Sequence, residues 1–243
     1  MKIINALSVL SLVLFGSCTR VLGIGSCNTG VVTDSVAVNT FSKIKVSATE
    51  IQYIPSKENR VVWSACEHIA DYVKVSVKNG SLELGLDEGC DRSKCVLKFV
   101  VYGNENLTDI DATGASQFSY KGDILSDELD IDLSGASRFG ISGKISVGKL
   151  DVDCSGASAF EANDVVCGKL DVDVSGASDA KLQGKCGKAD YDASGASGIH
   201  ASKMIAEDAV ADASGCSSIN CYASGNIKQN TSGMSAVKCE TGK

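Results

Sequence analysis

The chain has 243 residues, of which 44% are apolar and only 5% aromatic, and its formal charge is −7. An acidic surface repels phosphate backbones, and Lys and Arg nowhere cluster with aromatic residues, so we expect no nucleic-acid partner. Twenty-five Gly with a single Pro favour an all-β chain with frequent turns over a helical one.

The first 17 residues are typical of a secretory signal. Lys2 supplies a positive start, residues 6–15 are apolar, and the run ends in Gly-Ser-Cys18. The apolar run is too short to span a bilayer. Two small residues before a cysteine resemble the lipobox of bacterial lipoproteins, so we expect residues 1–17 to be removed and Cys18 to carry a lipid that attaches the chain to a membrane. The alternative is ordinary cleavage, which gives a soluble secreted or periplasmic protein.

Cysteine usage fits export to an oxidising compartment. Removal of residues 1–17 changes the formal charge to −8, and setting Cys18 aside leaves ten cysteines, an even number. Cys90 and Cys95 flank a four-residue loop, so we expect them to form a local disulfide; two free thiols at strand ends are the alternative.

The part of the chain that follows is β-rich but irregular. Residues 18–30 are small and polar and are expected to form a tether. Residues 67–72 are the one segment with a helical pattern, and Asn79-Gly80 between two alternating runs predicts a hairpin. We expect residues 31–106 to form the irregular initial coils that start or cap a larger β-structure.

A four-residue motif, most often Ser-Gly-Ala-Ser, organises the remainder. Its seven copies begin 21, 21, 20, 19, 20 and 18 residues apart. A fixed period of about 20 residues with short strands is typical of a solenoid, in which each repeat buries its apolar face against its neighbours. The copies are Thr113–Ser116, Ser134–Ser137, Ser155–Ser158, Ser175–Ser178, Ser194–Ser197, Ser214–Ser217 and Ser232–Ser235.

Aligning the repeats on this motif separates inward from outward positions. Apolar residues stand five, three and one residues before the motif and five and seven residues after its first residue, so these columns should point inward. The motif glycine is expected at a corner, where it can adopt positive φ. With several strands and no helix per repeat, the pattern predicts an all-β, right-handed parallel β-helix whose coils stack about 4.8 Å apart. Residues 107–243 form its regular part, in one domain with 31–106.

The repeated Leu-Asp-(Ile/Val)-Asp-x-Ser-Gly-Ala-Ser unit carries a family resemblance. Together with residues 41–47 and 72–82, it resembles the putative auto-transporter adhesin head domain family, or head GIN domain, from about residue 35 to the end. The resemblance implies an exported, often lipid-anchored β-helical domain of Bacteroidetes-type bacteria, in the cell envelope as an outer-membrane lipoprotein. It brings no catalytic motif. The cysteines within the repeats depart from the family pattern.

Aspartates stand four residues before the first five motifs and two residues before the first six, and Asn230 stands two residues before the seventh. If the coils stack in register, like charges repel along these columns and a hard cation such as Ca²⁺ would relieve the repulsion. The hypothesis is a ladder of weak cation sites; the alternative is a solvated strand face with nearby lysines as counter-charge. The eight candidate residues are Asp130, Asp132, Asp151, Asp153, Asp171, Asp173, Asp190 and Asp192.

Two cysteine pairs fall at equivalent positions of successive repeats. These are Cys221 with Cys239 and Cys167 with Cys186. Neighbouring coils are close enough for a disulfide, although in-register parallel geometry is often poor. Packing of the thiols as small hydrophobes is the alternative for both pairs.

Three functional hypotheses follow. The first is an exported, lipid-anchored, non-catalytic envelope module that adheres to a glycan or a cell-surface protein. The second is a polysaccharide-processing β-helix enzyme, and the third a scaffold that self-associates end to end. We expect no enzyme, because the carboxylates are evenly periodic, neither His68 nor His200 lies in a catalytic motif, and the motif serines lack the Gly-x-Ser-x-Gly setting of a nucleophile. We expect no cofactor beyond weakly bound Ca²⁺, and we expect His200 to face solvent.

Overall fold

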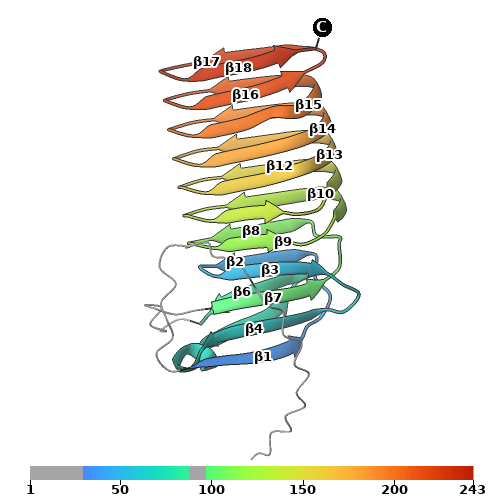
Figure 1. The fold of residues 1–243 in the computed structure, drawn as a ribbon, viewed down its shortest axis with the longest axis vertical. Coiled ribbons are helices and arrows are strands. Elements are labelled where there is room, and N and C mark those ends of the chain that lie inside the picture. Colours follow the sequence, from blue (N-terminus) through green and yellow to red (C-terminus); the bar gives the residue numbers. More distant parts are fainter. Residues whose placement is uncertain (1–29, 88–96, 243) are drawn as a thin grey trace, which may run out of the picture.

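The computed structural model describes residues 30–87 and 97–242. It is a β-solenoid of about seven turns whose coils lie about 20 residues apart, which confirms the predicted fold class. The coils stack into a tall column with the first strand at one end and the last two at the other (Figure 1). Only one short helix occurs in the described residues.

The regular coils begin at residue 109, and their strands pair in parallel with the coils before and after them. The register is uninterrupted at the segment before each motif, where Leu129, Leu150 and Leu170 stand in line. The strands are β8 (Asp109–Thr113), β9 (Gln117–Tyr120), β10 (Ile124–Leu133), β11 (Arg138–Ile141), β12 (Ile145–Cys154), β13 (Ala159–Val174), β14 (Asp179–Ala193), β15 (Gly198–Ala213), β16 (Ser218–Ala223), β17 (Ile227–Thr231) and β18 (Ala236–Thr241).

Each coil has two flat surfaces that meet at the four-residue motif, which we call the corner. The pre-corner face consists of the outward residues of the segments before each corner, such as 129–133 and 150–154. The post-corner face consists of the outward residues of the segments after it, such as 138–141 and 159–162. A third segment, such as 145–148, closes the coil.

The corner glycines adopt the conformation that the repeat predicts. Gly135 has φ of 74° and Gly156 has φ of 78°, a region that L-residues rarely adopt. A Cβ on Gly135 would lie 2.3 Å from the Gly114 carbonyl oxygen of the coil below. That carbonyl accepts a hydrogen bond from the Ala136 amide at 2.6 Å, and Ala157 donates to Gly135 at 2.7 Å. The corners therefore stack backbone on backbone with no room for a side chain.

At four of the seven corners the last serine donates a hydrogen bond to the coil below; these are Ser158, Ser197, Ser217 and Ser235. Ser197 is buried, and its hydroxyl donates to the Ser194 carbonyl in its own corner and to the Val174 carbonyl one coil below, at 2.8 and 2.9 Å. Ser217 repeats this arrangement with Ser214 and Ala193. These hydrogen bonds stabilise the turn, in agreement with the prediction that the motif forms a corner of the coil.

The inward columns form a continuous core. Phe118, Phe139 and Phe160 are buried and stack along the column axis, with ring centroids 5.6 and 5.4 Å apart. Tyr53, in the N-terminal part that precedes the regular coils, stacks on Tyr120 with ring centroids 4.8 Å apart. This contact joins the N-terminal part to the same core. Stacked aromatic pairs of this kind add to the free energy gained by burying the rings.

The N-terminal part forms the base of the column. Its strands are β1 (Val31–Ala37), β2 (Lys43–Ser47), β3 (Glu50–Pro55), β4 (Arg60–Cys66), β5 (Val73–Lys78), β6 (Ser81–Leu86) and β7 (Leu97–Gly103), with the 3₁₀ helix η1 (Glu67–Tyr72). β2 and β3 pair in parallel with β8 and β9 and form the first coil, whereas β4 runs antiparallel to β1 and β7. The predicted helical turn and irregular base are confirmed.

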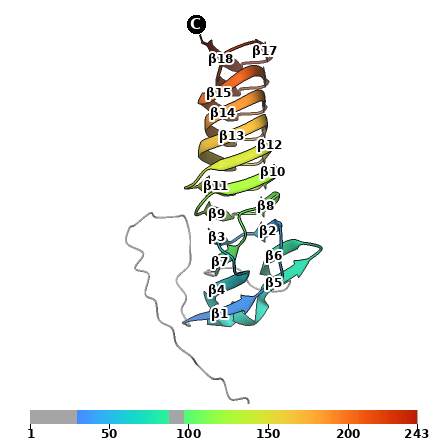
Figure 2. The same ribbon diagram turned by 90° about the vertical axis from the view of Figure 1, so that its right-hand side faces the viewer.

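The predicted hairpin is also confirmed. β5 and β6 pair antiparallel around Asn79 and Gly80, whose φ values are 50° and 75°. Two consecutive positive φ angles are those that a tight hairpin turn needs. The hairpin projects sideways from the base (Figure 2). Among the described residues, no helix has the length and apolar character required to cross a bilayer.

The corner geometry predicts a cost for any side chain at its glycine. We expect Gly156→Ala to lower the free energy of unfolding by about 1–3 kcal/mol, because the residue keeps a positive φ and its Cβ would lie 2.5 Å from the Gly135 carbonyl oxygen. Ala157→Ser in the same exposed corner is the matched control and should change it by no more than about 0.5 kcal/mol. Equal urea midpoints for the two variants would contradict the corner constraint.

Candidate functional site

The pre-corner face carries two columns of aspartates in register. The outer column has Asp109, Asp130, Asp151, Asp171 and Asp190, and the inner column has Asp111, Asp132, Asp153, Asp173, Asp192 and Asp212. Successive members are direct neighbours on adjacent parallel strands, which lie about 4.8 Å apart. The structure thus brings together all eight residues that the sequence singled out.

The two columns differ in their counter-charges. In the outer column, the Lys149 ammonium lies 2.7 Å from Asp151, and Lys169 lies 3.1 Å from Asp171. In the inner column, no ion pair within the described residues involves its four central members. These are Asp132, Asp153, Asp173 and Asp192. These four carboxylates therefore form a row that no ion pair neutralises.

Proton affinities in this row reflect the crowding. Partial burial, with repulsion from Asp132, Asp151 and Asp173, raises the pKa of Asp153 to about 6. Burial and neighbouring carboxylates also raise the pKa of Asp132 and of Asp192. Burial raises these values because it disfavours the charged form, and like charges add to the effect.

Lysines neutralise one end of both columns, and an amide donates to the last aspartate at the other end of the inner column. Lys43 and Lys45 of β2 stand opposite Asp109 and Asp111, with nitrogen–oxygen distances of 3.3 and 3.6 Å. At the other end, the Asn230 amide donates to Asp212. The sequence pattern did not reveal the two lysines, because they are contributed by a strand 66 residues earlier in the chain.

The columns do not form a compact metal site. Within the parts of the chain that the structure describes, no three His, Cys, Asp or Glu side chains converge in a way that could hold a metal ion. Hard cations in proteins usually have six or more oxygen ligands. A cation on this face would therefore bridge two neighbouring carboxylates and keep most of its water.

The closing serines of the corners form hydrogen bonds within the fold, and His200 lies at the surface. Six of the seven last serines are buried, and among them Ser197 and Ser217 donate to main-chain carbonyls. His200 faces solvent, as predicted, 3.6 Å from Asp179. A nucleophilic serine needs a free hydroxyl next to a base, and these hydroxyls are committed to the fold.

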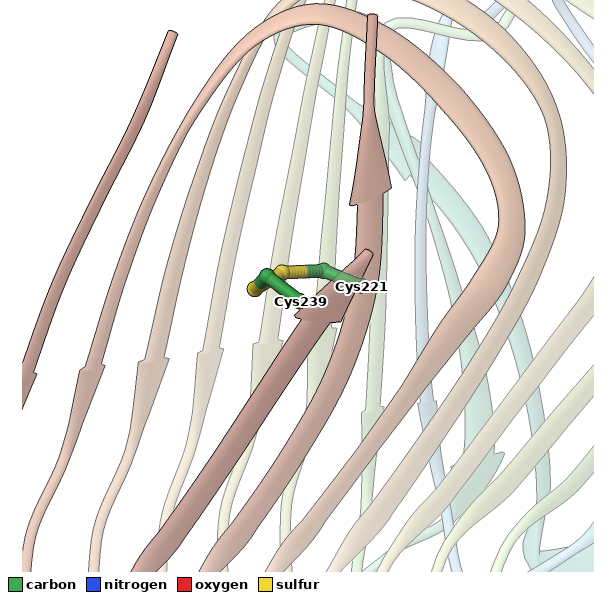
Figure 3. Close-up of a disulfide and its surroundings, with 2 residues drawn as sticks. All are labelled: Cys221 and Cys239. Carbon is green, nitrogen blue, oxygen red and sulfur yellow. A yellow bond between two sulfur atoms is a disulfide. The ribbon is translucent and has the colours of Figure 1, made fainter. Parts of the chain in front are cut away.

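One of the two proposed cysteine pairs is bonded. Cys221 and Cys239 form a disulfide with a Cα–Cα distance of 4.4 Å, which ties β18 to β16 at the end of the column (Figure 3). Cys167 and Cys186 lie in register and are buried, but they are free thiols and pack as small hydrophobes. Cys66 also forms a disulfide. The predicted Cys90–Cys95 pair and the lipid attachment at Cys18 lie outside the described residues.

The sequence reasoning passed over the post-corner face, which has a shallow hollow around Gly140. Arg138 and Lys121 lie at this hollow. The signal was present in the repeat alignment, because a glycine stands in an outward column where other repeats have longer side chains.

The stacked coils and their outer columns define a parallel β-solenoid domain with repeats of about 20 residues. The chain belongs to the family described as putative auto-transporter adhesin, head GIN domain, which matches residues 40–241. This membership confirms the resemblance drawn from the sequence, and it makes the chain an adhesin-type domain of the cell surface or envelope.

Solved structures share the fold. A putative adhesin from Parabacteroides merdae is 21% identical with a TM-score of 0.74, covering 88% of this chain and 97% of its own. A putative lipid binding protein from Parabacteroides distasonis is 16% identical with a TM-score of 0.67, covering 89% and 98%. A putative adhesin from Bacteroides fragilis is 19% identical with a TM-score of 0.64, covering 88% and 99%. These identities demonstrate a common fold only. A comparison with curated proteins gave no match.

The raised carboxylate pKa values predict that mild acid stabilises the protein. Between the ordinary value near 4 and about 6, the folded state binds protons at Asp153 that the unfolded state releases, so stability rises as pH falls from 7 to 5. We expect Asp153→Asn to raise Tm at pH 7.5 by on the order of 1–2 °C and to flatten the pH dependence.

Asp127→Asn, an exposed acid outside the columns, is the matched control and should leave the pH profile unchanged. Below pH 4.5 the trend reverses, because hydrogen bonds with Lys74 and Lys181 lower the pKa values of Glu83 and Glu161. A melting temperature that falls steadily from pH 7 to pH 5 would contradict the crowding of the inner column.

Proposed function

We propose that this protein is an exported, lipid-anchored, non-catalytic module of the bacterial cell envelope that adheres to a glycan or a cell-surface protein through its pre-corner face. The signal-like residues 1–17 and Cys18 support the export and the anchor at the outer membrane. Family membership and the adhesin descriptions of structural relatives agree with a binding role.

The inner aspartate column carries this proposal. Its four central carboxylates have no ion pair with any described residue, and they repeat at one fixed spacing on a stacked scaffold. Such a row attracts partners with regularly spaced positive charge, and many weak contacts in a fixed array add up to useful avidity. A partner without positive charge could reach the same row through Ca²⁺ ions that bridge neighbouring carboxylates.

The polysaccharide-processing alternative lacks support at this face. A glycoside hydrolase uses two carboxyl groups with different environments, one an acid and the other a base or nucleophile. Here Asp132, Asp153 and Asp192 share the same environment and their pKa values shift in the same direction. Equivalence along a column suits repeated binding rather than one reaction centre.

Replacing the four central aspartates tests the proposed face. We expect Asp132→Asn, Asp153→Asn, Asp173→Asn and Asp192→Asn together to reduce binding of the purified protein to bacterial and host-type cell surfaces and to a glycan array at least tenfold. Binding of the unaltered protein should weaken with rising salt, since exposed charges are screened. Adding Ca²⁺ should strengthen binding to uncharged glycans, and calorimetry on metal-stripped protein should show weak Ca²⁺ uptake.

The control neutralises four exposed acids elsewhere by changing Glu58, Asp71, Glu105 and Asp127 to their amides, which removes the same net charge. Full loss in this control, or no loss in the column variant, would contradict the proposed face. Protease accessibility on intact cells and labelling of Cys18 with a fatty acid test the location and the anchor separately.

The uncovered end of the column supports a second candidate function, end-to-end self-association. β17 and β18 pair with β15 and β16 of the coils beneath them, and no further coil covers them among the described residues. Ile227 and Val237 are only partly buried there, and Met234 is 82% exposed. An open strand edge with apolar side chains is a template for pairing with another chain.

Self-association predicts a mass that depends on concentration. In sedimentation velocity, the unaltered protein should form dimers or longer species at high micromolar concentration, and Val237→Lys with Met234→Lys should keep it monomeric. Ser146→Lys on the third segment is the control and should not interfere. A monomer at every concentration would refute the scaffold.

A further inference from the structure

Gly140 interrupts the outer column of the post-corner face. This column consists of the residues that pair in register with Gly140 on successive strands from β3 onward. All of its other described members have a side chain; they are Gln52, Ser119, Glu161, Lys181, His200, Asn220 and Lys238. A glycine inside a strand costs stability, because it loses the most backbone freedom on folding and has no side chain to pack. Its presence here needs a reason.

The backbone does not supply that reason. Gly140 is not among the residues with positive φ, and a Cβ built on it would meet nothing within 4 Å. Of the described glycines, only Gly80 has comparable space, and Gly80 needs its φ of +75° for the hairpin turn. By contrast, a Cβ on Gly143 would lie 1.9 Å from the Gly122 carbonyl oxygen. What Gly140 provides is open space on an outer surface.

That space is a hollow of about 400 Å³ that extends over β9, β11 and β13. This volume lies within the range of small-ligand sites. Phe118 and Phe139 belong to its floor and are buried. Its polar lining consists of Gln117, Ser119, Lys121, Arg138, Ser142, Glu161 and Asn163.

The charged side chains at the hollow differ in whether they have a partner. The Glu161 carboxylate accepts hydrogen bonds from Lys181 at 2.9 Å and from Asn163 at 3.4 Å. Arg138 and Lys121 are exposed, and neither has an ion pair within the described residues. The hollow therefore offers two unpaired cations beside a carboxylate that is already satisfied. In a chain whose net charge is −7, this is a local reversal of sign.

We propose that the hollow around Gly140 binds a short acidic oligosaccharide, one whose sugar carries a carboxylate or a sulfate. The planar fork of Arg138 suits such an anion, and Lys121 adds a second positive charge. The amide of Gln117 and the hydroxyl of Ser119 are matched to sugar hydroxyls, and the sugar ring occupies the space above Gly140. The acidic remainder of the surface disfavours long polyanions.

This inference rests on the proposed adhesive function and adds a second, differently charged surface to it. The pre-corner face attracts positive charge, whereas the hollow selects a ligand with a local negative group. The two surfaces lie on either side of the same corners, so each can be altered without the other.

The test compares three defined probes by calorimetry: a uronate tetrasaccharide, a sulfated tetrasaccharide and a neutral glucose tetrasaccharide. We expect at least one acidic probe to bind tenfold or more tightly than the neutral one, and the comparison of the two acids identifies the anion. Inorganic sulfate alone should bind at least tenfold more weakly than the preferred sugar. Equal binding of sulfate, or no preference for an acidic sugar, would overturn the proposal.

Gly140→Thr is the decisive variant. Threonine favours strands and its Cβ has room, so Tm should stay the same or rise while binding of the preferred probe falls at least tenfold. Arg138→Gln should abolish the preference for acidic over neutral sugar. Asn220→Thr, in the same column in a later coil, is the matched control and should bind like the unaltered protein.

Unchanged binding by Gly140→Thr would refute the site, and Arg138→Gln decides the matter should the threonine variant lose stability. The four-aspartate variant of the pre-corner face separates the two proposals, because it should still bind the acidic probe. Cell adhesion that depends on the aspartates without any acidic-sugar binding overturns only the hollow. Acidic-sugar binding that depends on Gly140, with adhesion independent of the aspartates, overturns only the pre-corner face.

Discussion

The structure depends on one close contact that recurs at each corner from the second, Ser134–Ser137, onward. There, a glycine with positive φ lies directly on the glycine of the coil below. The amide of the residue that follows the upper glycine donates a hydrogen bond to the carbonyl oxygen of the lower glycine at 2.6 to 2.7 Å. Because a Cβ at this position would overlap a backbone oxygen, the contact fixes both the spacing and the register of the coils. At four corners the closing serine adds a side-chain hydrogen bond to the coil below, as Ser197 does to Val174. Once the corners are in register, all inward and outward columns follow.

Register has opposite consequences inside and outside the solenoid. Inside, it places equivalent apolar side chains on one another, which stabilises the core, as in the stack of Phe118, Phe139 and Phe160. Outside, it places carboxylate beside carboxylate, which raises the pKa of Asp153, and the four central members of the inner column have no ion pair within the described residues. A fold built by exact repetition thus concentrates whatever its outward positions carry, and the charged face is a direct result of the same contact that stabilises the corner.

The regular half of the fold was predictable because its period is short and each column depends on local alternation. The hairpin at Asn79-Gly80 and the inward positions of Cys221 and Cys239 followed from the same local rules. The N-terminal base was harder to predict, because β2 lies between β6 and β8 and its Lys43 and Lys45 pair with aspartates far along the chain. The candidate site shows the same division. The aspartate columns were read from the repeat, but the hollow requires Arg138 and Lys121 from neighbouring coils around Gly140, and only the stacked structure gives that proximity.

Both proposed surfaces require that the coils stack without slipping, and one distance tests this directly. Asp111 and Asn230 belong to the same outward column and are six coil steps apart. Spin labels introduced there as non-natural amino acids, which leave the native cysteines untouched, should give a single narrow distance near 29 Å in pulsed electron resonance, since each step adds about 4.8 Å. A broad distance distribution, or a mean distance between the labels beyond about 40 Å, would contradict the in-register stacking of coils about 4.8 Å apart and with it both proposed faces.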